Sequence, residues 1–287
     1  MALANGTPGY TPPTNIRIYR KQHWDFPKIW AEEGDVVWDG ESSLATYFSE
    51  GIEAPEIVPW GWSPALVHEL ELAGVPRRYM PDNEMLAKLR LLSSRVSTVP
   101  VQQSLGIDVR VCYNIKEVEQ CLDLWHQVMM KSPWSSSGKG LMQTDNANWR
   151  GWVQRILRLQ GAVVVERLIM DKKQDFAMEF WIDEEGVRYH GINVIHTDAH
   201  GHFVSNANDV PLDAEEYISS MLHSPRVLTE TRDFFLQHLK RMAPWYRGSV
   251  GVDMLVTAPS ELHPCIEINW RMTMGMVSFL TSANLDR

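Results

Sequence analysis

The end of the chain holds two strand-like segments joined by a short turn, and this pattern constrains the fold more than any other feature. Ser249–Thr257 and Leu262–Asn269 flank the turn-forming stretch Ala258–Ser260, which is the composition expected of a β-hairpin. Residues two apart on a strand point to the same face. Glu267 and Asn269 should therefore project together, while Ile266 and Ile268 face the core.

The preceding sequence predicts more strands and one helix. Ala162–Glu166 is a continuous apolar run that ends in an acid. Apolar residues alternate over Phe176–Ile182 and, more weakly, over Val187–Ile195, as expected of strands. A helix is expected around Leu228–Met242. We therefore expect residues 161–287 to form a larger α+β lobe with an antiparallel sheet.

Residues 81–160 are expected to form a smaller α+β lobe. Asp82–Arg95 and Lys116–Trp125 are predicted as helices, and Val128–Met130 as an apolar strand. Over Trp149–Leu157 the apolar residues recur at i, i+3, i+4, i+7 and i+8. That spacing is typical of a helix packed on a sheet.

Residues 1–80 are expected to form an α/β lobe of Rossmann-like character. Val36–Trp38 and Glu56–Val58 are predicted as short strands. Ser63–Pro64 has the form of a helix N-cap followed by proline, and Gly74 should close that helix. Strand–turn–helix units of this kind indicate an α/β architecture.

Composition excludes some partners. The chain has 287 residues, is 44% hydrophobic and 22% charged, and carries a net charge of −9. This charge argues against nucleic acid or an anionic membrane as a partner, because phosphate binding needs clustered Lys and Arg. No stretch approaches the roughly 18 apolar residues of a membrane span, and no signal peptide is evident. Three cysteines without C-x-x-C spacing suit reduced thiols, so a cytoplasmic location is expected.

A lysine followed by a small-residue loop is the first candidate site. Lys131 ends a predicted strand and leads into Ser132–Gly140, rich in Ser and Gly. Such a loop offers backbone N–H groups and hydroxyls to phosphate, with the ammonium as counter-charge. It is not a Walker A motif, because Pro133 stands where glycine is required and Gly140 where Ser or Thr is required. A simple surface loop explains these residues equally well.

The hairpin carries a second candidate site. Asp253 on the first strand can reach the same face as Glu267 and Asn269. Two carboxylates and an amide oxygen are ligands suited to Mg²⁺. Arg271 could bind a phosphoryl or carboxylate group bidentately. We favour this interpretation over a solvated strand face.

Two further segments have open interpretations. Glu166, at the end of its apolar strand, could border a flat adenine, with Asp175 available to ribose hydroxyls. An ordinary strand end explains Glu166 better when that segment is taken alone. His196, His200 and His202 could bind a transition metal, although a loop with solvated imidazoles is the preferred interpretation.

Taken in order, these segments resemble the ATP-grasp superfamily. The matching parts are VMMKSPWSSSGKG, VVVERLI followed by Asp175, and the pair GVDML and IEINWR. The resemblance covers about Pro81–Phe279 and implies an ATP-grasp fold preceded by the N-terminal lobe. It also implies ATP and Mg²⁺ as cofactors, with Mn²⁺ as a substitute, and small-molecule carboxylate and amine substrates. A homodimer is a further possibility.

The resemblance also assigns roles to individual residues. The ATP residues would be Arg95, Lys131, Ser136, Ser137, Gly138, Lys139, Glu166, Arg167, Leu168, Asp175 and Glu267. The metal ligands would be Asp253, Glu267 and Asn269, and the catalytic residues Lys131 and Arg271.

Three departures from the family pattern stand out. Trp270 and Arg271 occupy the stretch where a proline commonly follows Glu-x-Asn. Gly251 stands where many members have an arginine, so that Arg271 or Arg247 has to substitute. The earlier nucleotide-binding cation is Lys88 or Arg95, of which we favour Arg95.

The implied activity is an ATP-dependent ligase that forms an amide-type bond by way of an acyl phosphate. The chemistry rests on positioning and charge neutralisation more than on covalent work by the protein. Two alternatives stay open: an ATP-grasp kinase that phosphorylates a hydroxyl, and a nucleotide-binding module without catalysis.

Overall fold

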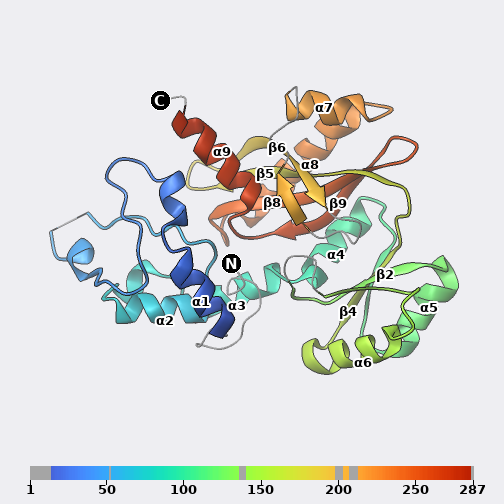
Figure 1. Cartoon of the computed structure of the whole chain (residues 1–287), viewed down its shortest axis with the longest axis horizontal. Helices are drawn as coiled ribbons and strands as arrows, with labels where there is room; N and C mark the ends of the chain where they lie inside the picture. The colour runs from blue at the N-terminus through green and yellow to red at the C-terminus, as the bar shows by residue number, and fades with distance from the viewer. Residues whose placement is uncertain (1–13, 52, 136–139, 198–202, 207–212, 286–287) are drawn as a thin grey trace.

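A computed structural model describes residues 14–51, 53–135, 140–197, 203–206 and 213–285. Its strands form two separate antiparallel sheets, which stand apart in Figure 1 with helices packed on each. In the described part of the chain, no helix is long and apolar enough to cross a membrane.

The first sheet has four strands in the order β1-β4-β2-β3. They are β1 (Val109–Cys112), β2 (Val128–Lys131), β3 (Leu141–Gln143) and β4 (Val163–Arg167). The predicted helices are confirmed as α5 (Ile115–Trp125) and α6 (Trp149–Gln160). Apolar residues of both helices, including Val118 and Val153, form one core with Val128, Met130 and Val165 of the sheet. The sheet is thus anchored on its helical face.

The second sheet has five strands in the order β7-β6-β5-β8-β9. They are β5 (Lys172–Ile182), β6 (Val187–Thr197), β7 (Phe203–Asn206), β8 (Gly248–Thr257) and β9 (Glu261–Asn269). The predicted terminal hairpin is confirmed as the pair β8 and β9.

One face of this sheet carries the main core of the protein. Helices α7 (Ala214–Ser220) and α8 (Arg226–Met242) lie against it. Phe176 and Phe180 of β5 pack there with Phe235 of α8, and all three side chains are fully buried. Each such burial contributes about 1.5–3 kcal/mol to stability, so this core holds the sheet rigid behind its other face.

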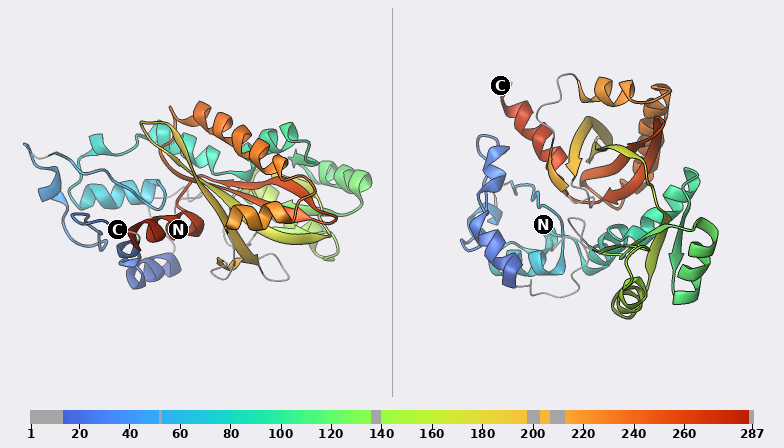
Figure 2. Two further views of the ribbon diagram at one scale, coloured as in Figure 1. Left: turned by 90° about the horizontal axis from the view of Figure 1, so that it is seen from above. Right: turned by 45° about the vertical axis from the view of Figure 1, so that its right-hand side comes forward.

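The C-terminal helix α9 (Met274–Leu285), which sequence analysis did not predict, packs on the other face. Figure 2 shows it on a different side of the sheet from α8. Glycines permit this close approach. A Cβ atom added at Gly251 would lie 2.8 Å from the Thr273 side chain, and one at Gly191 would lie 2.9 Å from the Phe279 ring.

Two consecutive helices precede the first sheet and correct one prediction. The single helix expected over 82–95 is instead α3 (Asn83–Leu92) followed by α4 (Arg95–Ser104). The break falls at Ser93 and Ser94, because the Ser94 hydroxyl accepts a hydrogen bond from the amide of Val96 and caps α4. Helix α4 contacts β9 of the large sheet and also β1 and β4 of the small one.

The N-terminal region is helical in its described part. It contains α1 (Thr14–Gln22), α2 (Pro64–Leu72) and three short 3₁₀ helices, Phe26–Ile29, Ala45–Phe48 and Arg77–Tyr79. The Ser63 cap is confirmed, since its hydroxyl accepts from the Leu66 amide at 3.2 Å. Gly74 follows α2 with a φ of +95°.

The two strands predicted in this region are wrong. Val36–Trp38 and Glu56–Val58 have no regular structure, and no strand occurs anywhere in the described residues before β1. Val36 and Val58 are exposed. A short run of two or three apolar residues cannot form a strand without a neighbour to pair with, and the described residues of this region supply none.

The second expected lobe boundary needs adjustment. Strand β4 lies beyond residue 160, yet it pairs with β1 and β2 of the first sheet. We therefore propose that the boundary between the smaller and larger lobes falls in the connection 168–171. The boundary near residue 80 stays a proposal as it was.

Candidate nucleotide and metal site

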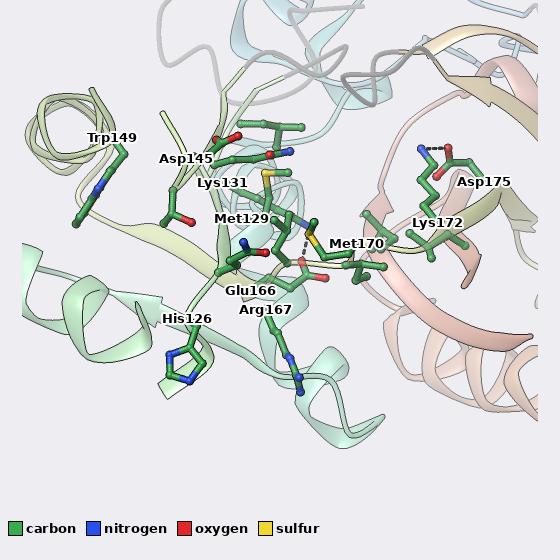
Figure 3. A pocket seen from close by; sticks show the side chains of 18 of the residues that line it. His126, Met129, Lys131, Asp145, Trp149, Glu166, Arg167, Met170, Lys172 and Asp175 are labelled. Carbon is green, nitrogen blue, oxygen red and sulfur yellow. Dashed lines mark ion pairs between the residues drawn. The ribbon is translucent and has the colours of Figure 1, made fainter. Parts of the chain in front are cut away.

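A cavity of about 950 Å³ lies between the two sheets and is lined by residues of both. From the first sheet, its wall includes Lys131 of β2, Glu166 of β4 and Leu168, which directly follows β4. From the second sheet, it includes Lys172 and Asp175 of β5. Figure 3 shows Lys131, Glu166, Lys172 and Asp175 around the cavity. Its apolar lining includes Met129, Leu168, Ile195, Leu255 and Ile266. A cleft that combines apolar side chains with several convergent polar groups suits a small ligand with a flat apolar part and a polar part.

Two of the predicted ATP residues form an ion pair in the cavity wall. The Lys131 ammonium pairs with the Glu166 carboxylate, and these side chains are 9% and 4% exposed. His263 of β9 contacts the other carboxylate oxygen, with 3.2 Å from Nε2 to Oε1. Burial alone would raise the pKa of Glu166, but the Lys131 charge and the His263 hydrogen bond outweigh it and hold this pKa below its ordinary value. Glu166 is therefore a buried carboxylate at neutral pH.

The expected hinge and ribose residues lie at the same cavity. Arg167 and Leu168 line it, directly after Glu166. Asp175 also lines it and forms an ion pair with Lys172, drawn as a dashed line in Figure 3. The structure thus gathers Lys131, the 166–168 hinge and Asp175 around one cavity, as the resemblance implies.

The three predicted metal ligands lie together on β8 and β9. Asp253 pairs directly with Glu267 in the sheet, and Asn269 lies opposite Gly251. Asp253 Oδ2 accepts a hydrogen bond from the Asn269 amide at 3.0 Å. Burial raises the pKa of Asp253 to about 7, and the neighbouring Glu267 charge adds to the effect. Clustered carboxylates that resist ionisation together favour a bound cation.

Two arginines contact other oxygens of this cluster. Arg95 Nη2 lies 2.8 Å from Glu267 Oε2, and its Nη1 donates to the Ser132 carbonyl at 2.9 Å and to the Ser135 hydroxyl at 2.6 Å. Arg271 Nη2 donates to Asn269 Oδ1 at 2.9 Å. The positively charged guanidinium of Arg95 thus contacts the Glu267 carboxylate of this cluster.

The donor set fits Mg²⁺ better than a softer metal. Two carboxylates and an amide oxygen are hard ligands. The described residues contain no group of three or more His, Cys, Asp or Glu side chains arranged to hold a metal ion. A magnesium ion here would consequently need phosphate oxygens or water to complete its coordination.

The competing cations have different partners in the structure. Lys88 pairs with Glu84 at 2.8 Å and lies over the Trp245 ring, whereas Arg95 reaches the metal cluster. Arg247 pairs with the exposed Glu184. Arg95 and Arg271 therefore contact the predicted metal ligands, and their roles toward a nucleotide stay predictions.

One predicted orientation is wrong. Ile266 was expected to face the core but lines the cavity. The register of β8 and β9 shifts between Asp253 and Leu255, so extra residues of β9 bulge out and the alternation of faces breaks. Ile268 lies in the main core as expected. Gln102 of α4 holds the bulge by donating from Nε2 to the carbonyls of Cys265 at 3.1 Å and Ile266 at 3.3 Å.

Several predicted residues lie outside the described part of the chain. These are Ser136, Ser137, Gly138, Lys139, His200 and His202. His196 lies in β6, but its side chain is outside the description. Their proposed roles stay predictions.

Sequence analysis missed four groups of this region. Met129, Leu255 and Ile266 line the cavity, and His263 contacts Glu166. Leu255 lies two residues after Asp253, so the alternation of a strand could have placed it on the same face. His263 had no such signal, because its partner lies on the other sheet.

No protein-family model matches the sequence, and no curated protein sequence matches it. Among solved structures, the biotin carboxylase domain of Hydrogenobacter thermophilus 2-oxoglutarate carboxylase, in complex with MgADP, ADP and bicarbonate, is similar with 12% identity and a TM-score of 0.51. It covers 70% of this chain and 47% of its own. Biotin carboxylase from Campylobacter jejuni, in a β,γ-ATP complex, is 14% identical with a TM-score of 0.52, over 74% of this chain and 48% of its own.

Pyruvate carboxylase from Rhizobium etli is also similar, with 18% identity and a TM-score of 0.52 over 77% of this chain and 19% of that one. The chain thus spans about half the length, or less, of these structures. At such identities the similarity concerns the fold. These proteins have the ATP-grasp fold, and this chain has it too, with two α+β lobes around a cavity.

Proposed function

We propose that the protein is an ATP- and Mg²⁺-dependent ligase that joins a small carboxylate to an amine. The observation that carries this proposal is the arrangement of the site. A buried Lys131–Glu166 pair stands in the wall of a cavity lined by both apolar and polar side chains, and the Asp253, Glu267 and Asn269 cluster lies on the strands that supply Leu255 and Ile266 to the same cavity. Two similar structures are complexes with MgADP or with a β,γ-ATP ligand, which supports a nucleotide as the occupant.

The apolar residues of the cavity would hold the adenine. Met129, Leu255 and Ile266 provide flat contact, and the hinge at Glu166–Leu168 provides backbone and carboxylate groups for the base edge. Asp175 would accept hydrogen bonds from the ribose hydroxyls, as a carboxylate does. Lys131, at the end of β2, would direct its ammonium toward the phosphates.

The opposite end of the site would handle charge. Asp253, Glu267 and Asn269 would bind magnesium, which supplies neutralisation of the phosphate oxygens when bound. Arg95 and Arg271 each have a guanidinium at this cluster and would meet phosphoryl oxygens bidentately. Lowering the charge on the transferring phosphoryl is the main catalytic contribution expected of such a site.

The proposed reaction has two steps. A substrate carboxylate oxygen attacks the γ-phosphorus, and ADP leaves with the electrons of the broken P–O bond. The amine nitrogen then attacks the carbonyl carbon of the acyl phosphate, and inorganic phosphate leaves while the nitrogen loses a proton to solvent. Arg271, beside Asn269, would stabilise the acyl phosphate between these steps.

A turnover assay tests the proposal. The purified chain is incubated with Mg–ATP and a matrix of small carboxylates and amines, and the release of both ADP and phosphate is measured. We expect release that requires both substrates and falls by at least about 10²-fold in Glu267→Gln, with the fold intact by circular dichroism.

Other outcomes are equally informative. ADP formed without phosphate, together with a stable phosphorylated product, would establish a kinase. A nucleotide-dependent rise in melting temperature, equal in both proteins and without any ADP release across the matrix, would establish a binding module and overturn the ligase proposal.

A further inference from the structure

One contact at the cavity joins the two lobes. His263 belongs to β9 of the large sheet, whereas Glu166 is the last buried residue of β4 in the small sheet. Nε2 of His263 lies 3.2 Å from Oε1 of Glu166, and their side chains are 13% and 4% exposed. Among the ion pairs of the described residues, Glu166 has two partners, Lys131 from its own sheet and His263 from the other.

The two partners divide the carboxylate between them. Lys131 pairs with Oε2 and His263 contacts Oε1, so the plane of the carboxylate is held from two directions. A single ion pair would leave the Glu166 side chain free to rotate about its last torsion, which is broad for sp³–sp² bonds. The second contact therefore fixes the orientation of the carboxylate, and with it the direction of its remaining lone pairs relative to the cavity.

The backbone that carries His263 is itself held in place. His263 pairs with Leu255 at one end of the β9 bulge, and Glu267 pairs with Asp253 at the other. Gln102, which is buried, donates to the two carbonyls within that bulge. His263 thus stands on a rigid part of the large sheet, four residues before a proposed metal ligand.

We propose that His263 is a positioning residue of the nucleotide site that sets the choice of base. It orients the Glu166 carboxylate across the lobe boundary, so that this carboxylate accepts a hydrogen bond from the exocyclic amine of adenine. A guanine base presents a carbonyl oxygen at the same place, which repels a carboxylate. The inference rests on the proposed nucleotide function and adds to it a residue on β9 that touches neither base nor phosphate.

Three variants of His263 test this role. In His263→Phe the ring is kept and the donor is lost, in His263→Gln an amide donor takes the approximate place of Nε2, and in His263→Asn the amide is too short to reach Glu166. His238→Phe is a matched control, because His238 stacks on Phe234 of α8 within the same helix. Each protein is titrated, with Mg²⁺ present, with non-hydrolysable ATP and GTP analogues and with inorganic tripolyphosphate.

We expect His263→Phe and His263→Asn to lower the affinity for the ATP analogue by about tenfold or more, as the loss of a hydrogen bond to a charged group implies. Their binding of the GTP analogue and of tripolyphosphate should stay within about threefold of the wild type, so the preference for ATP falls. His263→Gln should keep most of this preference, and His238→Phe all of it.

Each contrary outcome is distinct. Wild-type preference for ATP in His263→Phe would overturn the inference. An equal loss of affinity for the ATP analogue and for tripolyphosphate in all three variants would show that His263 has only a structural role. That outcome would also overturn the inference. If the wild-type protein binds no nucleotide, the proposed function itself fails, and this inference fails with it. Should His263→Phe not fold, His263→Asn against His263→Gln makes the same comparison.

Discussion

At the end of the cavity nearest β2 and β4, a lysine, a carboxylate and a histidine are paired with one another and largely shielded from water. On β8 and β9, Asp253, Glu267 and Asn269 also have partners, but two of these partners are arginines that the proposed chemistry needs elsewhere. The Lys131–Glu166–His263 group, which we call the base end, requires no exchange of partners to receive a ligand. The group Asp253, Glu267 and Asn269, the metal end, requires it.

The difference shows what each set of contacts is for. A buried pair that keeps its partners contributes rigidity and direction, which is useful for recognising a base. An arginine–carboxylate contact that must open when a metal arrives couples the binding of the metal to the binding of the phosphates. The same ATP-grasp fold thus carries a preformed end and an exchangeable end.

The largest effect on stability is expected from the base end. Lys131→Met leaves the Glu166 carboxylate buried with only His263 as a partner, which should lower the free energy of unfolding by about 3–5 kcal/mol. Urea denaturation measures it. The double variant Lys131→Met with Glu166→Gln should recover most of the loss, because no buried charge then lacks a counter-ion.

An exposed pair is the matched control for that experiment. Arg150 and Glu119 lie 3.1 Å apart, with side chains 62% and 40% exposed. Arg150→Met should change stability by less than about 1 kcal/mol. Similar losses for Lys131→Met and Arg150→Met would show that the base end is not a buried pair in solution.

A second effect concerns Glu179, a buried acid on the face that carries the metal end. Burial raises its pKa to about 8, although the Thr273 hydroxyl donates to it at 2.8 Å. The folded state then binds a proton that the unfolded state releases, so stability falls as pH rises from about 4.5 to about 8. Glu179→Gln keeps an acceptor for Thr273 and should flatten this decline, gaining on the order of 1–3 kcal/mol at pH 8.5. Denaturation at pH 5 and pH 8.5 checks it, and parallel pH profiles for both proteins would contradict it.

A third effect tests the exchange at the metal end. Arg95→Met frees Glu267 of its guanidinium partner, so Mg²⁺ without nucleotide should bind about tenfold more tightly than to the wild type. In the wild type, a non-hydrolysable ATP analogue should raise the affinity for Mg²⁺, and in Arg95→Met it should raise it less. Calorimetric titration with MgCl₂ measures both, and equal affinities in the two proteins without nucleotide would show that Arg95 does not compete with the metal.

The smallest effect is expected at the ribose. Asp175→Asn removes the charge but keeps an acceptor, so affinity for an ATP analogue should fall only about two- to fivefold, as a single weakened hydrogen bond implies. The 2′-deoxy analogue, compared in both proteins, identifies the hydroxyl involved. A loss of a hundredfold would show that Asp175 contributes more than a ribose contact.

The base end and the metal end should therefore respond differently to substitution. Large stability losses at the base end and changes in metal affinity at the metal end would confirm that the site combines a fixed part with an exchangeable part. If Lys131→Met changed metal affinity while Arg95→Met changed stability most, the roles would be reversed.

Much of the fold was predictable because its signals are local. The helical stripe at Trp149–Leu157 and the hairpin of β8 and β9 depend on residues close in sequence, and both are confirmed. The predicted strands at Val36–Trp38 and Glu56–Val58 are wrong because a strand needs a partner strand, which a short apolar run does not specify.

In the site too, only the features that depend on local sequence were predictable. Asp253, Glu267 and Asn269 share one face by the period of two along paired strands, so the sequence by itself determined that they meet, and it placed Lys131 at the end of its strand. Only the tertiary structure decided that Arg95 lies on Glu267, that a bulge turns Ile266 into the cavity, and that His263 reaches Glu166. These contacts join residues 97 to 172 positions apart or depend on a register shift, and no local periodicity can specify either.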